Sequence, residues 1–279
     1  RAGRFRSVNP SNIKMKMITS LILSVIAFAL AILFLLYYVQ DKLIFFPQKL
    51  DPDYQFGFRE SFEERFFRTE ENVRIHALHF KVKQPRGLVY YLHGNAGSLQ
   101  GWGTVAGDFT DQQYDVLMID YRGYGKSHGK ISEPALLHDA LAIFDTLKTE
   151  YGEKKIIVYG RSLGTGMASY VASQRDPGLL ILESPYYNLP DASRSYFPWF
   201  PSFLIRYKFR NDLYLAKTRC PVHVFHGSRD EVIDVRGSYQ LKSVLKPEDS
   251  LYIIEGGHHN DLALFDEYGE RLQEILIRF

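Results

Sequence analysis

Near the middle of the chain stands Ile156-Ile157-Val158-Tyr159-Gly160-Arg161-Ser162-Leu163-Gly164-Thr165-Gly166, an apolar run followed by a glycine-rich turn. The apolar, β-branched residues 156–159 are typical of a strand that is covered on both faces of a parallel sheet. The turn carries Gly160-x-Ser162-x-Gly164, the nucleophile-elbow pattern, in which a strained backbone presents a serine hydroxyl between a strand and a helix. A side chain at either glycine is expected to collide with the neighbouring strand or helix. We therefore predict a nucleophile at Ser162, and the alternative is a Gly/Ser-rich turn of another α/β protein.

Short apolar runs and helical patterns alternate on both sides of this turn. The predicted strands are residues 62–69, 73–82, 88–92, 116–119, 156–159, 179–182, 222–225 and 251–254. The predicted helices are residues 99–109, 134–148 with Ser132 as N-cap, the segment after the turn, 235–245 and a last helix from about residue 261. This alternation predicts an α/β fold with a mostly parallel sheet, right-handed crossovers and an antiparallel edge formed by the first two runs.

Length and composition narrow the class of protein. With 279 residues and a formal net charge of +2, we expect one large α/β domain with an appendage and no nucleic-acid partner. The single cysteine, Cys220, excludes a disulfide within the chain and a cysteine-based zinc site. The histidines show no metal-ligand spacing, so no metal and no organic cofactor are predicted.

The N-terminal part of the chain predicts a membrane anchor. Residues 1–16 form a basic leader without acidic residues, and residues 17–39 hold no charged residue and are long enough to cross a bilayer as a helix. Tyr37 and Tyr38 stand where an interfacial aromatic belt is expected. The alternatives are a cleaved signal peptide and a buried core helix. The apolar run is long for a signal peptide, and no small-x-small cleavage pattern stands directly before Gln40.

The charges around this anchor predict its orientation. The positive-inside rule places the basic leader in the cytoplasm and the part of the chain after the anchor on the far side of the membrane. The chain has no Asn-x-Ser/Thr acceptor with an allowed middle residue, which favours a bacterial periplasm over a eukaryotic lumen. We expect a single-pass protein with an extracytoplasmic catalytic domain.

Two segments interrupt the simple alternation. Residues 40–60 are predicted to be a linker between the anchor and a domain at residues 61–279. Its apolar residues 43–47 could rest on the membrane surface or pack on the domain, and packing on the domain is the preferred expectation. Residues 185–212 lie between two strands, beyond their expected carboxyl ends, where ligands of α/β proteins bind. This segment is rich in aromatic residues: Tyr186, Tyr187, Tyr196, Phe197, Trp199, Phe200, Phe203, Tyr207 and Phe209. We predict a small aromatic cap over the site, and the alternative is a crossover helix whose aromatic residues belong to the core.

A serine nucleophile needs a base, and the base needs an orienting acid. In hydrolases of this type the chain order is Ser, then Asp or Glu, then His. Asp230 follows one predicted strand, and His258 and His259 follow the next. Because the carboxyl ends of parallel strands share one edge of a sheet, these residues are expected to meet Ser162 there. The arrangement predicts a Ser-His-Asp triad.

The residues alone leave some roles of the triad open. Adjacent positions in a loop point in different directions, so His258 and His259 are equal candidates for the base. Asp230 is the preferred acid. Asp234 lies further from its strand end, and Glu183 ends the preceding strand; both are expected to be solvated or cap-stabilising carboxylates.

The developing oxyanion needs preorganised N–H donors. We expect the backbone N–H of Leu163, directly after the nucleophile, and the backbone N–H of Asn95 in the loop after the third predicted strand. His93 in the same loop is interpreted as a structural histidine. Arg161 either faces outwards or contacts a polar leaving group.

Several segments together resemble a known family. They are His93-Gly94-Asn95-Ala96-Gly97, Asp120-Tyr121-Arg122-Gly123-Tyr124-Gly125-Lys126-Ser127, Gly160-Arg161-Ser162-Leu163-Gly164, His226-Gly227-x-x-Asp230-Glu231-Val232-Ile233 and Gly256-Gly257-x-His259-Asn260-Asp261. From about residue 43 to its end the chain resembles the α/β-hydrolase domain-containing protein 13 group, the Bem46-like serine hydrolases. The type 17 depalmitoylases are similar in several of these segments.

This resemblance implies an α/β-hydrolase fold with eight strands and helices on both faces, and an N-terminal membrane anchor is usual in the group. It also implies that the base is His259, the histidine directly before Asn-Asp. His258 stands where relatives often have a small or neutral residue, which is a departure from the pattern.

The combined expectation is a membrane-anchored serine esterase, an EC 3.1.1-like carboxylic ester hydrolase. The expected partner is a small ester or lipid-like acyl substrate, and the small cap favours short to medium acyl chains. The alternatives are a thioesterase acting on acyl-proteins or acyl carriers, an amidase or peptidase, and a non-catalytic scaffold.

Overall fold

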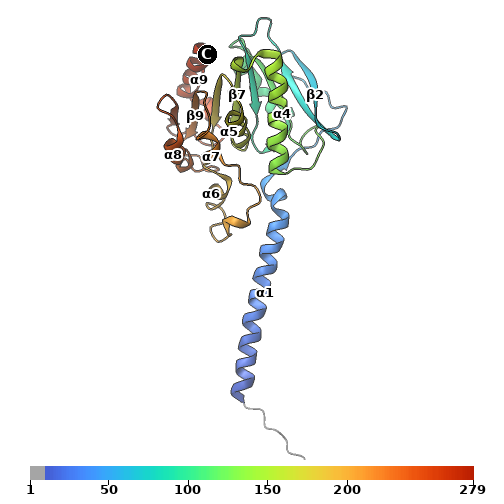
Figure 1. Cartoon of the computed structure of the whole chain (residues 1–279), viewed down its shortest axis with the longest axis vertical. Coiled ribbons are helices and arrows are strands. Elements are labelled where there is room, and N and C mark those ends of the chain that lie inside the picture. Colours follow the sequence, from blue (N-terminus) through green and yellow to red (C-terminus); the bar gives the residue numbers. More distant parts are fainter. Residues whose placement is uncertain (1–9) are drawn as a thin grey trace, which may run out of the picture. The chain divides into compact units, whose positions relative to one another are not determined.

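The computed structural model describes residues 10–279, and it divides into two compact units at the bond between Leu43 and Ile44. The first nine residues of the basic leader, with Arg1, Arg4 and Arg6, lie outside the described residues. The first unit is a helix, and the second unit is the α/β domain (Figure 1).

The helix of the first unit, α1, spans Pro10–Ile44. The segment Lys14–Ile44 of this helix is long and apolar enough to cross a membrane. None of the residues in its most apolar part is buried inside the protein. A helix that is apolar on all sides and is not covered by protein is typical of a membrane span rather than a core helix. The helix continues past residue 39, so the first residues of the expected linker are helical.

The domain is built on one eight-stranded sheet. In spatial order the strands are β10 (Ser250–Ile254), β9 (Val222–Gly227), β8 (Leu179–Glu183), β7 (Ile156–Arg161), β4 (Leu88–Leu92), β6 (Asp115–Ile119), β3 (Val73–Phe80) and β2 (Phe62–Glu70). All pairs from β10 to β6 are parallel. β3 runs antiparallel to both β6 and β2. The prediction of a mostly parallel sheet with an antiparallel edge is confirmed.

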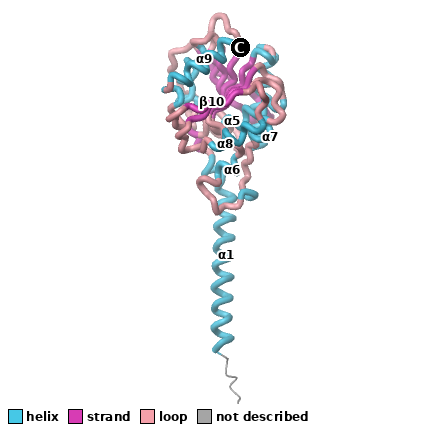
Figure 2. Tube along the Cα trace, turned by 90° about the vertical axis from the view of Figure 1, so that its left-hand side faces the viewer, coloured by secondary structure: helices cyan, strands magenta, loops and turns pink. Residues whose placement is uncertain are grey.

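Helices cover both faces of this sheet, as predicted. One core contains side chains of α4 (Glu133–Tyr151) and α5 (Gly164–Gln174), and the other contains side chains of α9 (Asp266–Arg278). Alternate strand residues enter the two cores, for example Tyr90 and Tyr91 of β4. In Figure 2 the strands accordingly lie between α9 and the helices on the α5 side.

Some helix boundaries differ from the sequence pattern. The helix expected at residues 99–109 is three short pieces: α2 (Leu99–Trp102), a 3₁₀ turn (Gly103–Ala106) and α3 (Gly107–Thr110). Its glycines disfavour a continuous helix. Helix α8 (Arg236–Leu241) ends in a 3₁₀ turn, and α9 starts after another 3₁₀ turn. Ser132 caps α4 through its side chain, as expected.

The apolar residues 43–47 of the predicted linker pack on the domain, which is the preferred of the two expectations for them. β1 (Phe46–Pro47) pairs in parallel with β5 (Ala96–Gly97) in a small separate sheet. The side chain of Phe45 is buried in the core, and its ring centroid lies 4.8 Å from that of Tyr207. The compact unit that contains the sheet begins at Ile44, before the boundary predicted at residue 60, and it includes the buried Phe45.

The aromatic segment at residues 185–212 contains α6 (Leu189–Ser193), a 3₁₀ turn (Ser202–Leu204) and the first residues of α7 (Asn211–Leu215). Both interpretations of its aromatic residues hold in part. Tyr186, Tyr207 and Phe209 are buried in the core, whereas the residues between Tyr196 and Phe203 include exposed rings.

Candidate active site

The elbow that carries Ser162 joins β7 to α5. Ser162 has φ +50°, a left-handed conformation that is strained for a residue with a side chain. A Cβ atom at Gly160 would lie 2.6 Å from the Cβ of Ala168, and one at Gly164 would lie 2.0 Å from the carbonyl oxygen of Leu92. The predicted collisions are confirmed, and they explain why glycine is needed on both sides of the serine.

The structure brings three of the predicted residues into one hydrogen-bonded series. His259 Nε2 lies 3.0 Å from Ser162 Oγ, and His259 Nδ1 lies 2.7 Å from Asp230 Oδ2. All three side chains are largely or fully buried. Because an ionised carboxylate only accepts, Nδ1–H donates to Asp230 and leaves Nε2 able to accept the serine proton.

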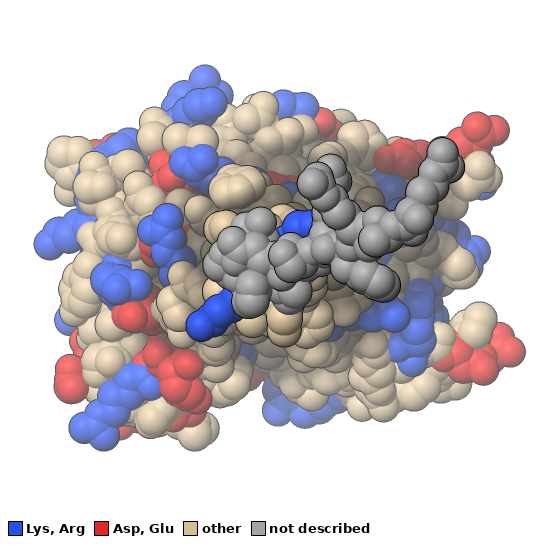
Figure 3. All heavy atoms as spheres, turned by 90° about the horizontal axis from the view of Figure 1, so that it is seen from below, with Lys and Arg blue, Asp and Glu red and all other residues tan. Residues whose placement is uncertain are grey.

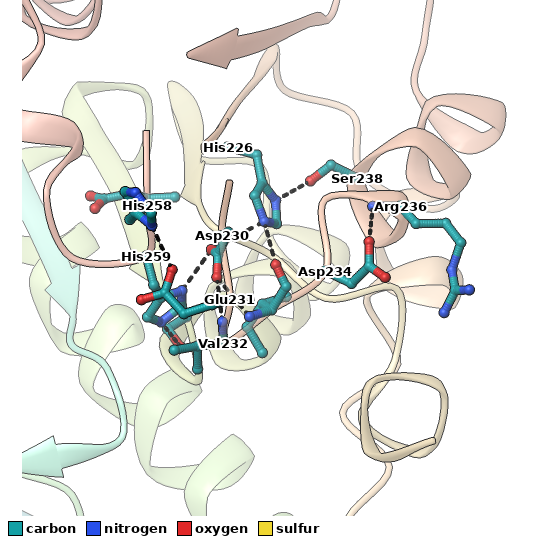
Figure 4. Close-up of polar contacts among 12 residues, drawn as sticks. His226, Asp230, Glu231, Val232, Asp234, Arg236, Ser238, His258 and His259 are labelled. Atoms are coloured by element: carbon teal, nitrogen blue, oxygen red, sulfur yellow. Dashed lines mark hydrogen bonds and ion pairs between the residues drawn. The ribbon is translucent and has the colours of Figure 1, made fainter. Parts of the chain in front are cut away.

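The rival residues lie elsewhere. The exposed ring of His258 is directed at Glu231, with Nδ1 2.9 Å from Oε2 (Figure 4). Glu183 pairs with Arg161, whose Nε lies 3.0 Å from Oε1. Asp234 accepts the backbone N–H of Arg236 at the start of α8, which is the cap-stabilising role expected for it. None of the three rivals reaches the hydroxyl of Ser162 through a hydrogen bond among residues 10–279.

Hydrogen bonds hold Asp230 as a carboxylate. Its Oδ1 accepts the backbone N–H groups of Val232 and Ile233 at 2.9 and 2.7 Å. Burial by itself would raise the pKa of Asp230, but hydrogen bonds from His226 and His259 outweigh burial and hold that pKa well below its usual range. The acid therefore remains charged at neutral pH.

His226 is a site residue that the sequence reasoning missed. It is fully buried, and its Nε2 lies 3.2 Å from Asp230 Oδ2 and 2.8 Å from the carbonyl oxygen of Ile233 (Figure 4). A carbonyl only accepts, so Nε2 carries a hydrogen and donates toward Asp230 as well. Its Nδ1 lies 2.7 Å from Ser238 Oγ. The signal in the sequence was the segment His226-Gly227-x-x-Asp230. It places a histidine near the carboxyl end of β9 and the acid in the loop that follows.

The loop after β4 lies beside the predicted nucleophile, since a Cβ atom at Gly94 would be 3.7 Å from the Cβ of Ser162. Asn95 Oδ1 accepts from Tyr124 Oη at 3.2 Å. Among residues 10–279, neither the Asn95 nor the Leu163 backbone N–H donates to another backbone or side-chain group. Both donors remain available to an oxyanion.

Two further residues of this edge have structural partners. His93 Nδ1 lies 2.7 Å from the Gly94 carbonyl oxygen and donates to it, which agrees with a structural histidine. Arg161 Nη2 lies 3.3 Å from the His259 carbonyl oxygen, and its guanidinium lies 5.2 Å from the ring centroid of Trp102. Together with its ion pair to Glu183, these contacts tie the elbow to the loop that carries the histidine.

One group of potential metal ligands lies close together within the described part of the chain: Glu70, His138 and Asp139. The guanidinium of Arg122 donates to both carboxylates, with Nη2 2.7 Å from Glu70 and Nε 2.6 Å from Asp139. The group already holds a cation of the protein's own, and it therefore fits an ion-pair network rather than a metal centre.

Charge on the surface of the domain is mixed in sign. On the face shown in Figure 3, Lys and Arg side chains lie among Asp and Glu side chains.

The chain is similar to several known hydrolases. A family profile described as serine aminopeptidase, S33 matches residues 83–214. The chain is 32% identical over 212 residues to lysophosphatidylserine lipase ABHD12 of Xenopus tropicalis, covering 67% of this chain and 55% of that protein. This chain thus spans about half the length of that relative. It is 33% identical over 237 residues to alpha/beta hydrolase domain-containing protein 17C of Homo sapiens, covering 80% of this chain and 69% of that protein.

Solved structures share the fold. The Pyrococcus furiosus esterase Pf2001 superposes with a TM-score of 0.69 at 22% identity, covering 84% of this chain and 97% of that chain. A soluble variant of monoglyceride lipase from Saccharomyces cerevisiae superposes with a TM-score of 0.60 at 16% identity, covering 80% of this chain and 97% of that chain.

Proposed function

Because this chain belongs to the α/β-hydrolase family, we propose that it is a serine hydrolase that cleaves carboxylic esters through an acyl-enzyme on Ser162. The observation that carries the proposal is the hydrogen-bonded series from Ser162 through His259 to Asp230. Within the family we assign the chain to the type 13, Bem46-like group on the sequence segments described above.

The proposed reaction uses each residue in turn. Ser162 Oγ attacks the ester carbonyl while His259 Nε2 takes its proton, and Asp230 stabilises the imidazolium that forms. The backbone N–H groups of Leu163 and Asn95 stabilise the oxyanion. The imidazolium then gives its proton to the leaving alcohol. Water, activated by the same imidazole, hydrolyses the acyl-enzyme and returns the proton to Ser162.

The proposed substrate is a small or lipid-like acyl ester of short to medium chain length. The cap is small and is hydrogen-bonded to the loop that holds the acid, which favours a short to medium apolar acyl group over a charged one. A relative whose name describes it as a lysophosphatidylserine lipase supports a lipid-like ester. The second candidate substrate is a thioester. The chain is similar over most of its length to a type 17 protein, and the resemblance to the type 17 depalmitoylases implies cleavage of acyl thioesters.

We also propose that α1 anchors the protein as a single membrane span, with the N-terminus in the cytoplasm and the catalytic domain on the other side. The length and apolar character of α1 and the basic residues before it support this orientation.

The test of the catalytic proposal is removal of the Ser162 hydroxyl. Ser162→Ala is expected to abolish both turnover of an activated ester and covalent labelling by a fluorophosphonate probe. The control Ser243→Ala, at an exposed serine, is expected to retain both. Labelling of Ser162→Ala at the wild-type level would refute the assignment. Rates on matched ester, thioester and amide substrates then separate the candidate reactions.

A further inference from the structure

The cap carries four exposed aromatic rings, which we call the aromatic cap surface: Tyr196, Phe197, Trp199 and Phe203. Their exposed fractions are 53%, 45%, 60% and 78%. The rings of Phe197 and Trp199 contact each other edge-on at 6.4 Å instead of entering the core. In Figure 1 this part of the cap follows α6 and lies below α7 and α8, away from the sheet. Exposed apolar rings grouped in this way mark an interaction surface.

The cap is fixed at the place where the chain enters the domain. Phe45 directly follows the last residue of α1, and its ring packs against Tyr207. Phe203 precedes Tyr207 by four residues, so their Cα atoms are at most about 14 Å apart. Phe203, at one end of the aromatic cap surface, therefore lies close to the point at which Ile44 joins the domain.

This position identifies the occupant of the surface. The uncharged run of α1 ends at residue 39, and the five remaining helical residues rise by about 8 Å in total. A bilayer that holds α1 thus has its interface within reach of the domain entry. Tyr and Trp are the residues enriched at membrane interfaces, because their rings are apolar at one end and polar at the other. The composition of the surface matches a lipid interface.

The same surface is connected to the proposed triad. Tyr196 Oη donates to the carbonyl oxygen of Val232 at 2.6 Å and approaches that of Glu231 at 3.3 Å. The N–H of Val232 in turn donates to Asp230. Hydrogen bonds thus connect the cap to the loop that holds the acid.

We propose that the aromatic cap surface docks into the interface of the bilayer that holds α1. The inference rests on the proposed membrane anchoring, and it does not require the proposed ester chemistry. The apolar rings enter the interface, and the cap thereby holds the loop of the proposed acid close to lipid-borne substrates.

Tryptophan fluorescence tests this docking in the full chain. The chain has two tryptophans, and the second, Trp102, donates to the Ala96 carbonyl within the domain. The protein is reconstituted in phosphatidylcholine vesicles with and without lipids that carry bromine near the headgroup end of the acyl chains. Brominated lipid is expected to quench part of the wild-type emission. The quenchable part is expected to be lost in Trp199→Phe, in which only Trp102 emits.

A second measurement concerns lipid substrates. The double variant Trp199→Ser with Phe203→Ser is expected to hydrolyse a bilayer-embedded long-chain ester several-fold more slowly and a soluble activated ester at the wild-type rate. Ile277→Ser, which changes an exposed apolar residue at the end of α9, is the matched control and is expected to change neither rate.

Emission that brominated lipid does not quench, or quenching that is equal in wild type and Trp199→Phe, would overturn the proposal. Unquenched emission together with loss of self-association in the double variant would assign the surface to a second copy of the chain instead. Failure of the ester chemistry is seen separately as absent turnover and absent probe labelling, and it leaves the quenching measurement unaffected.

Discussion

Each carboxylate oxygen of Asp230 accepts two N–H groups: Oδ1 from the backbone of Val232 and Ile233, and Oδ2 from the rings of His226 and His259. A buried carboxylate with this many donors keeps its charge and has little freedom to rotate. The orientation of His259 thus depends on residues that never contact the substrate.

The contact of His226 with Asp230 leads to a first prediction. His226→Ala removes a donor to a charged group, which typically contributes about 1.5–3 kcal/mol, and we expect kcat to fall about 10- to 100-fold with KM nearly unchanged. His226→Gln, which retains a side-chain N–H, is expected to recover part of the loss. A parallel loss of kcat and of folded protein in both variants would show that His226 acts only on stability.

The two adjacent histidines give a second prediction. His259→Gln removes the ring between Ser162 and Asp230 and is expected to lower kcat by about 10³-fold or more. His258→Gln removes an exposed ring whose partner is Glu231, and it is expected to change kcat only a few-fold. Steady-state rates on one soluble ester compare the two, and equal losses would contradict the assignment of the base.

At the scale of elements, the elbow depends on how closely β7, α5 and β4 approach one another. Gly160 faces α5, whereas Gly164 faces the end of β4. These close approaches explain how a short turn holds Ser162 at a positive φ against the strain of that conformation.

A third prediction concerns this close approach. Gly164→Ala places a Cβ against the Leu92 carbonyl and is expected to lower the free energy of unfolding by about 3 kcal/mol or more. Gly101→Ala is the matched control, because no atom lies within 4 Å of the added Cβ and alanine favours helix α2. Denaturant unfolding of the detergent-solubilised protein measures both variants. A loss of unfolding free energy in Gly164→Ala no larger than that in Gly101→Ala would contradict the prediction. It would show that the end of β4 shifts to make room for the added Cβ.

At the scale of the whole molecule, a buried histidine ties three parts of the domain together. His79 of β3 is 1% exposed, its Nε2 lies 2.9 Å from Tyr151 Oη at the end of α4, and its Nδ1 lies 3.3 Å from Arg65 of β2. Burial, and then the positive charges of Lys81 and Arg65, lower the pKa of His79 to about 4, although Asp115 and Glu63 oppose this change.

This lowered pKa gives a fourth prediction. Between pH 6.5 and 4 the unfolded chain binds a proton at His79 that the folded domain does not bind. The stabilisation is therefore fully present above about pH 6.5 and is lost as the pH falls toward 4, by about 3 kcal/mol at most. His79→Gln is expected to flatten the dependence of unfolding free energy on pH in this window. His128→Gln, at an exposed histidine, is the control, and an unchanged slope in His79→Gln would contradict the prediction.

The apolar helix α1 and the α/β domain are separate units of the molecule, and the domain unit begins at Ile44. The apolar run indicated the helix, but the sequence placed the start of the domain too late. Burial of Phe45 against Tyr207 joins residues that are far apart in the chain, and no local pattern reports such a contact.

The sequence by itself determined the strands, their mostly parallel direction and the glycines of the elbow. Apolar runs and close packing at a turn are set by a few neighbouring residues, so the local sequence reports them. It also placed Ser162, Asp230 and the two histidines after strands that end at one edge. The residues alone left His258 and His259 as equal candidates, and only the family resemblance favoured His259. The tertiary structure shows which ring reaches Ser162, since adjacent loop residues point in directions that long-range packing fixes. The contact of His226 with Asp230 was likewise decided there, because side-chain distances across a loop depend on the whole fold.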